Sequence, residues 1–247
     1  MSIVIATTTF YKSTSELRFN LARKMVSEAI RAGHKVVIVD GSPIPEIAST
    51  FRTLGAEVYP QLHKGMGPSR REVFFHATEV AWREKIEYIL WTEPEKVDLI
   101  RSIPQIIAGL HGADIVIVGR VEKSWGTWPA FQVESEKAAN AVYNEACGVE
   151  GFDPMHGPVA FTLVAAKNFI DCRGDGGDVP DTYIQHYAPI KARSRGLGVG
   201  SVKIDITYPP EQRAEEEGAQ NEAMIDKRRW QLETLTKAYR TLANTYK

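Results

Sequence analysis

The sequence predicts an α/β fold in which helices cover both faces of a mostly parallel sheet. Apolar runs of strand length recur through the first half, and segments with apolar residues at helical spacing lie between them. Turns rich in Gly, Pro and Asp separate these segments. Such alternation is typical of βα units that build a parallel sheet through right-handed crossovers. The 247 residues suffice for one large α/β domain or two small ones.

The first half supports this prediction element by element. After an apolar opening strand, Leu17, Leu21 and Met25 recur at helical spacing, and Gly33 stands where a helix C-cap is expected. A second apolar strand ends in a strong turn signal at residues 40–43. The predicted strands are 4–7, 35–39, 57–59, 88–91 and 114–119, and the predicted helices are 16–32, 44–54, 65–85 and 97–110.

The second half is less regular. Residues 159–164 could form a strand or a buried segment, whereas the glycine-rich stretch 171–180 must be a loop. The acidic stretch 211–220 is predicted to be mobile. No linker forces a domain boundary, so we expect the halves 1–120 and 121–247 to form one continuous domain. The remaining predicted elements are helices 133–147, 181–195 and 221–244 and a strand at 202–207.

Composition excludes several classes of protein. A formal net charge of −1 removes the electrostatic case for nonspecific binding of nucleic acid. No apolar stretch approaches the roughly 20 residues that span a bilayer, and no secretory signal is visible. Cys147 and Cys172 are the two cysteines, too few for a disulfide framework in a chain of this length. The cytoplasm is therefore the expected location.

Motifs of several common enzyme classes are also missing. The first strand ends in Thr7-Thr8-Thr9, where a dinucleotide-binding strand would lead into G-x-G-x-x-G. The sequence has no P-loop and no G-x-S-x-G elbow. Its six histidines show no spacing typical of a zinc site. Any chemistry must therefore come from other polar groups at the ends of the predicted strands.

The most informative polar group follows the predicted strand 88–91. The apolar run 86–91 ends abruptly in Glu93-Pro94-Glu95. Ligands of open α/β sheets gather outside the carboxyl ends of the strands, where two carboxylates could hold a divalent cation that carries a phosphorylated substrate. The alternative is a solvated acidic turn, in which Glu95 or Asp98 favours the start of the next helix.

Two further segments offer groups for a phosphorylated ligand. Asp40, at the end of the second strand, could accept a ribose hydroxyl or a base edge, or could simply make an Asx-type turn before Gly41. In the segment 65–71, glycines let backbone amides approach a phosphate, and Arg70 or Arg71 could clamp its oxygens. The alternative there is a glycine turn that leads into a solvated basic helix start.

The order of these motifs resembles family-2-type glycosyltransferases with the nucleotide-sugar-binding (GT-A) fold, and polyprenyl-phosphate sugar transferases in particular. The resemblance covers about residues 3–207 and has motifs of moderate specificity. Glu93-Pro94-Glu95 stands in the place of the family's Asp-x-Asp metal motif. The other matching segments are 3–10 for the opening strand, 39–42 for V-D-D-G-S, 65–71 for G-x-G-x-A-R-N and 112–120 for G-A-D-I-V-I-G-S-R.

The resemblance implies transfer of a sugar from a nucleoside-diphosphate sugar to a hydroxyl acceptor, which is small or lipid-linked. The half 1–120 would bind the donor and 121–247 the acceptor, and the long terminal helix could serve a homodimer. Mn²⁺ or Mg²⁺ is the implied cofactor, although Glu-x-Glu replaces Asp-x-Asp and Lys96 could neutralise phosphate instead. A protein that binds a nucleotide or sugar without transferring it is the alternative.

The resemblance also assigns roles to particular residues. Asp181 is the favoured base toward the acceptor and Asp178 the second choice, although Asp181 could equally cap a helix. His156 would join Glu95 at the metal, or be structural. One of Trp125 and Trp128 could pack in the core while the other stacks on a sugar. The implied donor-binding residues are Thr7, Thr8, Asp40, Arg70, Arg71, Glu93 and Trp125.

Overall fold

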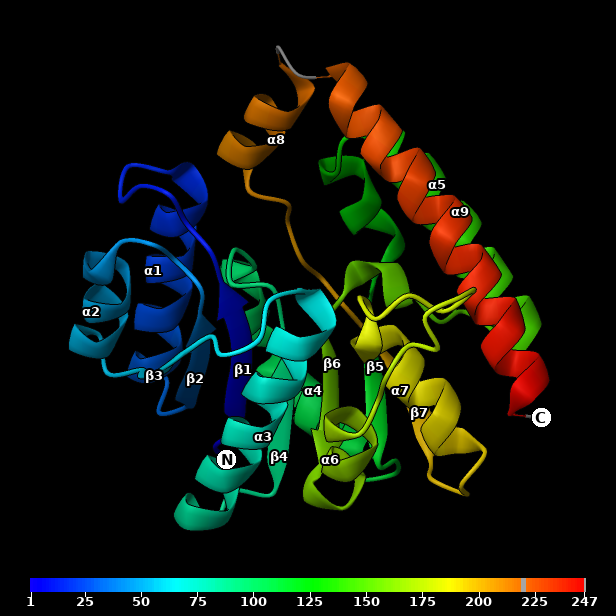
Figure 1. Ribbon diagram of the computed structural model, residues 1–247, viewed down its shortest axis with the longest axis horizontal. Helices are drawn as coiled ribbons and strands as arrows, with labels where there is room; N and C mark the ends of the chain where they lie inside the picture. Colours follow the sequence, from blue (N-terminus) through cyan, green and yellow to red (C-terminus); the bar gives the residue numbers. More distant parts are fainter. Residues whose placement is uncertain (219–220, 247) are drawn as a thin grey trace.

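A computed structural model, which describes residues 1–218 and 221–246, has a seven-stranded sheet with the order β3-β2-β1-β4-β6-β5-β7 (Figure 1). Strand β6 runs antiparallel to β4 and β5, and the other described strand pairs are parallel. This confirms the predicted α/β fold with a mostly parallel sheet. The strands are β1 Val4–Thr9, β2 Lys35–Asp40, β3 Glu57–Pro60, β4 Tyr88–Trp91, β5 Ile115–Arg120, β6 Val159–Thr162 and β7 Val199–Ile204.

Helices cover both faces of the sheet, because its strands are apolar on both sides. Helices α3 Met66–Glu84, α6 Leu163–Ile170 and α7 Ile184–Arg193 pack on one face. Helices α1 Leu17–Arg31, α2 Pro45–Thr53 and α4 Ile103–Leu110 pack on the other. Two long helices, α5 Ala130–Cys147 and α9 Asn221–Thr245, lie side by side beyond the β7 end of the sheet (Figure 1).

Three predicted elements have different bounds for identifiable reasons. The helix predicted over 97–110 is a 3₁₀ segment, Val97–Ser102, followed by α4, because Pro104 lacks an N–H and suits the first turn of a new helix. The segment 159–164 is β6 followed at once by α6, a helix that the apolar sequence concealed. Strand β7 begins at Val199 because it pairs with Ile115 at the start of β5.

The prediction that 211–220 is mobile was wrong for most of that stretch. Helix α8, Pro210–Glu217, occupies it and begins with a proline in its first turn. Its buried residues, Gln212 and Glu216, are four apart and therefore lie on one helix face. Residues 219 and 220 lie outside the described part of the chain.

The arrangement of the strands brings polar chain ends together. Strands β1, β2 and β4 are parallel neighbours, so Thr9, Asp40 and Trp91 end at the same edge of the sheet. Strands from before and after residue 120 belong to the same sheet. The division of the chain into a donor-binding half and an acceptor-binding half at that residue stays a prediction. Among the described helices, we find none that is long and apolar enough to cross a bilayer.

Candidate active site

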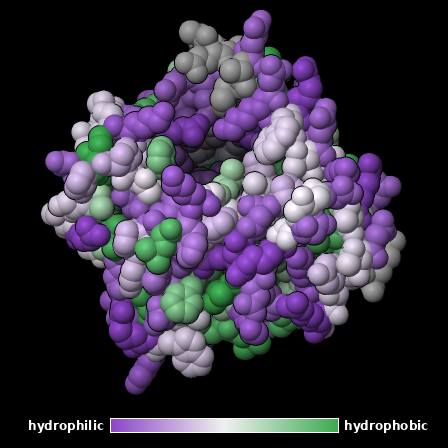
Figure 2. Space-filling model, in the orientation of Figure 1, coloured by the Kyte–Doolittle hydropathy of each residue, from purple (hydrophilic) through white to green (hydrophobic). Residues whose placement is uncertain are grey.

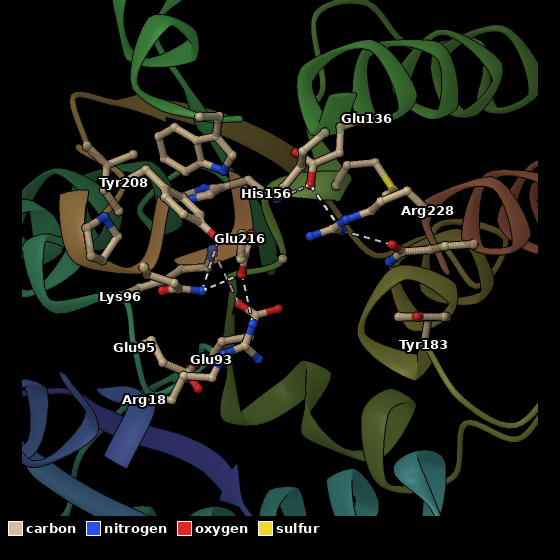
Figure 3. A pocket seen from close by; sticks show the side chains of 18 of the residues that line it. Arg18, Glu93, Glu95, Lys96, Glu136, His156, Tyr183, Tyr208, Glu216 and Arg228 are labelled. Carbon is tan, nitrogen blue, oxygen red and sulfur yellow. Dashed lines mark hydrogen bonds and ion pairs between the residues drawn. The ribbon is translucent and has the colours of Figure 1, made fainter. Parts of the chain in front are cut away.

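A cavity of about 300 Å³ opens beyond the carboxyl end of β4, between the sheet and helices α5, α8 and α9. Figure 2 shows the surface hollowed in its upper half, among mainly hydrophilic residues. Figure 3 shows the side chains that converge on the cavity from separate elements. The predicted site residues that line it are Arg70, Glu93, Glu95 and His156, while Thr7, Thr8, Asp40, Arg71, Trp125, Asp178 and Asp181 do not.

The two glutamates after β4 both line the cavity. A Cβ at Gly157 would clash with both carboxylate oxygens of Glu93, so any other residue there would force this carboxylate to move. Glu93 Oε2 is buried without a hydrogen-bond partner among the described residues, and Lys96 Nζ lies 3.8 Å from the carboxylate. Burial raises the pKa of Glu95, and the positive charge of Arg18 opposes that rise. The carboxylates thus lie at the cavity, with basic side chains beside them.

His156 presents a free nitrogen in the same cavity. Its Nδ1 lies 2.8 Å from the carbonyl oxygen of Val118, and because a carbonyl can only accept, Nδ1 carries the proton. The other nitrogen, Nε2, is buried and has no partner among the described residues. Burial, followed by the charges of Lys96 and Arg120, holds the pKa of His156 well below its usual value. A neutral imidazole with an unprotonated Nε2 is the form that binds metal ions.

A buried cluster of ion pairs lies next to the segment that carries His156. Arg120, the last residue of β5, donates to both carboxylate oxygens of Asp153 at 2.8 Å and to Glu136 at 2.6 Å. Asp153 immediately precedes the 3₁₀ segment Pro154–His156, and its carbonyl oxygen accepts a hydrogen bond from the His156 backbone N–H at 3.2 Å. Trp125 packs against the Arg120 guanidinium at 3.7 Å, whereas Trp128 lines the cavity. Trp128 is also buried and its ring lies 4.9 Å from the Arg120 guanidinium, so both tryptophans pack in the interior, and a sugar contact of either stays a prediction.

Arg70 and Arg71 point in different directions from the first turns of α3. Arg70 lies over the Trp91 ring at 5.2 Å and donates to the Thr182 carbonyl oxygen at 2.7 Å. It has no carboxylate partner among the described residues, and its Nε is buried without a partner. Burial lowers the pKa of Arg70, which the charge of Glu93 opposes. Arg71 instead donates to both oxygens of Asp181, at 2.5 and 2.7 Å.

Both candidate bases are held in ion pairs. The hydrogen bonds from Arg71 lower the pKa of Asp181, and the backbone N–H of Gly174 adds a further bond. Asp178 lies on the exposed loop before α7 and pairs with Lys237 of α9 at 2.7 Å. Neither aspartate lines the cavity, and the pair with Arg71 makes Asp181 a weaker base. Their predicted role as base remains a prediction.

A second hollow lies at the carboxyl ends of β1 and β2, beside the start of α3. Asp40 lies beneath it and accepts hydrogen bonds from Thr9 Oγ1 at 2.8 Å and from the Ser42 backbone N–H at 3.2 Å. The Asx-type turn at Asp40 is therefore formed. A contact of Asp40 with a ribose stays a prediction. Thr7 is fully buried below this level. The lining residues are Thr8, Thr9, Phe10, Gly41, Gln61, Lys64, Gly65, Met66 and Ser69.

Helix α8 contributes lining residues that the sequence interpretation missed. Glu216 accepts from Arg18 at 2.8 Å and from the Tyr208 hydroxyl at 2.8 Å, which joins α8 to α1 across the cavity. Gln212 donates to the Tyr208 hydroxyl at 2.9 Å. The pair Pro209-Pro210 followed by polar residues at i, i+4 spacing is a helix-start signal that could have revealed this segment.

Comparison with known proteins identifies the fold. No known family model matches the sequence, and no curated protein is similar enough in sequence to count as a relative. The structure is similar to glucosyl-3-phosphoglycerate synthase of Mycobacterium tuberculosis, with a TM-score of 0.54 and 10% identity over 92% of this chain and 80% of that one. The same enzyme in complex with Mn²⁺, UDP-glucose and phosphoglyceric acid matches with a TM-score of 0.52 and 11% identity, over 92% and 79% of the two chains.

A third similar structure is that enzyme with Mg²⁺ and UDP, with a TM-score of 0.52 and 11% identity over the same shares of the two chains. An identity this low relates the folds and does not by itself carry over an activity. The order of the strands, the antiparallel β6 and these likenesses agree with the fold expected from the sequence motifs. The chain has the GT-A fold of nucleotide-sugar-dependent glycosyltransferases.

Proposed function

We propose that this protein transfers a sugar from a nucleoside-diphosphate sugar to a hydroxyl acceptor. The observation that carries this proposal is a set of buried polar atoms without a hydrogen-bond partner in the described part of the chain, on five separate elements around one cavity. A buried polar atom without a partner is costly, so a polar ligand that satisfies all of them would bind favourably. Among the described residues, the atoms without such a partner are Arg70 Nε, Glu93 Oε2, Gln132 Oε1, His156 Nε2 and Arg228 Nε.

The neighbouring hollow suits the nucleotide of such a donor. Phe10 is 60% exposed there, so its ring is available to stack on a base. Thr8 and Lys64 offer a hydroxyl and a cation, and Asp40 would contact the ribose. Met66 lines both the hollow and the cavity, which makes the two spaces neighbours. The diphosphate would then extend toward Arg70 and Glu93.

The residues present fit a divalent cation at the diphosphate. His156 offers its unpaired Nε2 and Glu95 its carboxylate, and both suit Mn²⁺. In the described part of the chain, no three His, Cys, Asp or Glu side chains come together as a metal site. Diphosphate oxygens and water would therefore complete the coordination, and the ion would neutralise charge on the diphosphate. The complexes of the similar enzyme with Mn²⁺ or Mg²⁺ support this proposal.

In the transfer, the bond between the anomeric carbon and the diphosphate oxygen breaks, and its electron pair leaves with the diphosphate. The acceptor oxygen forms the new bond and loses its proton to a base, for which Asp181 and Asp178 stay proposed. Arg70 and Lys96 would stabilise the charge that develops on the departing diphosphate. Arg71 would act on Asp181 rather than on the donor, since the two are paired.

Calorimetry and a transfer assay test the proposal together. We expect UDP or GDP to bind more tightly with Mn²⁺ than without it, and the matching nucleotide sugar to be turned over with a hydroxyl acceptor. Binding without hydrolysis or transfer would favour the alternative, a protein that only recognises the nucleotide or sugar. The proposal also includes a relationship to polyprenyl-phosphate sugar transferases and a lipid-linked acceptor. It further includes a cytoplasmic location and a homodimer.

A further inference from the structure

The cavity has a basic wall on the side opposite the glutamates. Figure 3 shows Arg228 of α9 and Tyr183 across the cavity from Glu93 and Glu95. Arg228 Nη1 donates to Gln231 at 2.9 Å but lies 3.5 Å from the nearest carboxylate oxygen. Its Nε is buried and has no partner among the described residues. The Arg228 side chain is 16% exposed and lines the cavity, so part of its guanidinium can meet a ligand.

The carboxylates near Arg228 are already engaged with other groups. Glu136, the one within reach, accepts shorter bonds from Arg120 at 2.6 Å and from Gln132 at 2.7 Å. Glu216 on α8 is occupied by Arg18 and the Tyr208 hydroxyl. Glu136 is thus held more closely by Arg120 than by Arg228, and Glu216 already has Arg18 as its ion-pair partner.

A further cation on this wall is Lys227, the residue before Arg228. It lines the cavity and forms no ion pair with any described residue. Its pKa is lowered, first by desolvation and then by the charges of Arg228 and Arg18. Lys227 and Arg228 thus bring two adjacent positive charges to this wall, and of the two only Arg228 pairs with a described carboxylate, Glu136 at 3.5 Å.

We propose that Arg228 and Lys227 bind an anionic group, a carboxylate or a phosphate, on the acceptor. The proposal rests on the proposed sugar transfer, which places the donor diphosphate at Glu95 and His156. Because Arg228 lies across the cavity from Glu95, the anion that it meets belongs to the acceptor. A guanidinium with free N–H groups and an adjacent ammonium are suited to the oxygens of a carboxylate or phosphate.

Matched acceptors test this site. Glyceric acid and phosphoglyceric acid carry an anionic group, whereas glycerol offers hydroxyls without one. With UDP-glucose and Mn²⁺, we expect transfer to the two acids to exceed transfer to glycerol. Arg228→Gln should raise the KM for the acids roughly ten- to hundredfold, as expected for a lost charged hydrogen bond, and Arg228→Lys should restore part of the loss. Arg229→Gln is the matched control, because Arg229 is exposed and pairs with Asp226.

A binding measurement separates this inference from the proposed function. By calorimetry in the presence of UDP and Mn²⁺, phosphoglyceric acid should bind the wild type and bind Arg228→Gln at least about tenfold more weakly. Equal use or binding of glycerol and the acids would overturn the inference while leaving sugar transfer intact. A loss of UDP affinity in Arg228→Gln as large as the loss for the acid would also overturn it, since the donor would then be the anion. Failure to bind or turn over any nucleotide sugar would instead refute the proposed function.

Discussion

His156 donates a hydrogen bond from Nδ1 to the carbonyl oxygen of Val118 at 2.8 Å, which fixes the ring with Nε2 unprotonated in the cavity. Val118 belongs to β5, so the central sheet itself orients the imidazole. The burial of the ring holds its pKa well below the usual value, which favours the neutral ring with Nε2 available as a ligand. Backbone support of this kind is common around metal-binding histidines.

We therefore expect His156→Ala to weaken binding of Mn²⁺ in the presence of UDP, by at least about tenfold, because one protein ligand is lost. Calorimetric titration of Mn²⁺ measures the change. His63→Ala provides a control, since His63 is exposed and pairs with Glu72 outside the cavity. Unchanged Mn²⁺ affinity in His156→Ala would show that this histidine has a structural role only.

Phe10 should contribute to nucleotide affinity. Its ring is 60% exposed at the carboxyl end of β1, where it lines the hollow proposed for the nucleotide. Stacking of an aromatic ring on a base contributes about 1–3 kcal/mol, so Phe10→Ala should weaken UDP binding roughly 5- to 150-fold. Phe75→Ala removes an aromatic ring of similar exposure on α3 and should leave UDP binding as it is. Equal affinities of Phe10→Ala and wild type would place the base elsewhere.

Asp181→Asn separates a catalytic role from a structural one. If Asp181 is the base, the rate of transfer should fall about 10²- to 10⁴-fold while UDP still binds, and Asp178→Asn should retain activity. Normal transfer by Asp181→Asn would exclude it as the base. The pair with Arg71 predicts a separate, smaller effect on stability, about 1 kcal/mol at neutral pH, because the aspartate side chain is 36% exposed.

The lowered pKa of Asp181 determines how the stabilisation by its pair with Arg71 changes with pH. Arg71 lowers the folded-state pKa, so the pair stabilises the fold above the unfolded-state pKa and is lost as pH falls through the lower folded-state pKa. Urea unfolding of wild type and Asp181→Asn should therefore differ at pH 7 and converge in acid. A difference that grows toward low pH would contradict this reading of the pair.

Much of the fold followed from the sequence because apolar runs and turn residues carry local information. Strand β4 was predicted with its observed bounds, since an abrupt change from Trp91 to Glu93-Pro94-Glu95 marks where a buried strand must end. Helix α8 was missed because its acidic composition resembles a solvated connection. Only the tertiary contacts of Glu216 with Arg18 and Tyr208 show why it is helical and packed.

The candidate site was harder to predict, because neighbouring residues in sequence diverge in space. Arg70 and Arg71 are consecutive on α3 and so point about 100° apart, which sends one to the cavity and the other to Asp181. Trp125 lies in the 3₁₀ segment Glu122–Thr127 and Trp128 follows that segment directly, yet only Trp128 lines the cavity. Which member of each pair faces the ligand depends on packing against the sheet, and local sequence does not encode it.

Glu95 lines the cavity just beyond β4, and its proposed role in holding the donor diphosphate is tested most directly by the turnover of UDP-glucose. Glu95→Ala should lower the turnover number by at least about a hundredfold, with an unchanged melting temperature, because the charge that organises the departing diphosphate is lost. Glu87→Ala, at the other end of the same strand, should behave as the wild type. Wild-type turnover by a folded Glu95→Ala would contradict the proposed site.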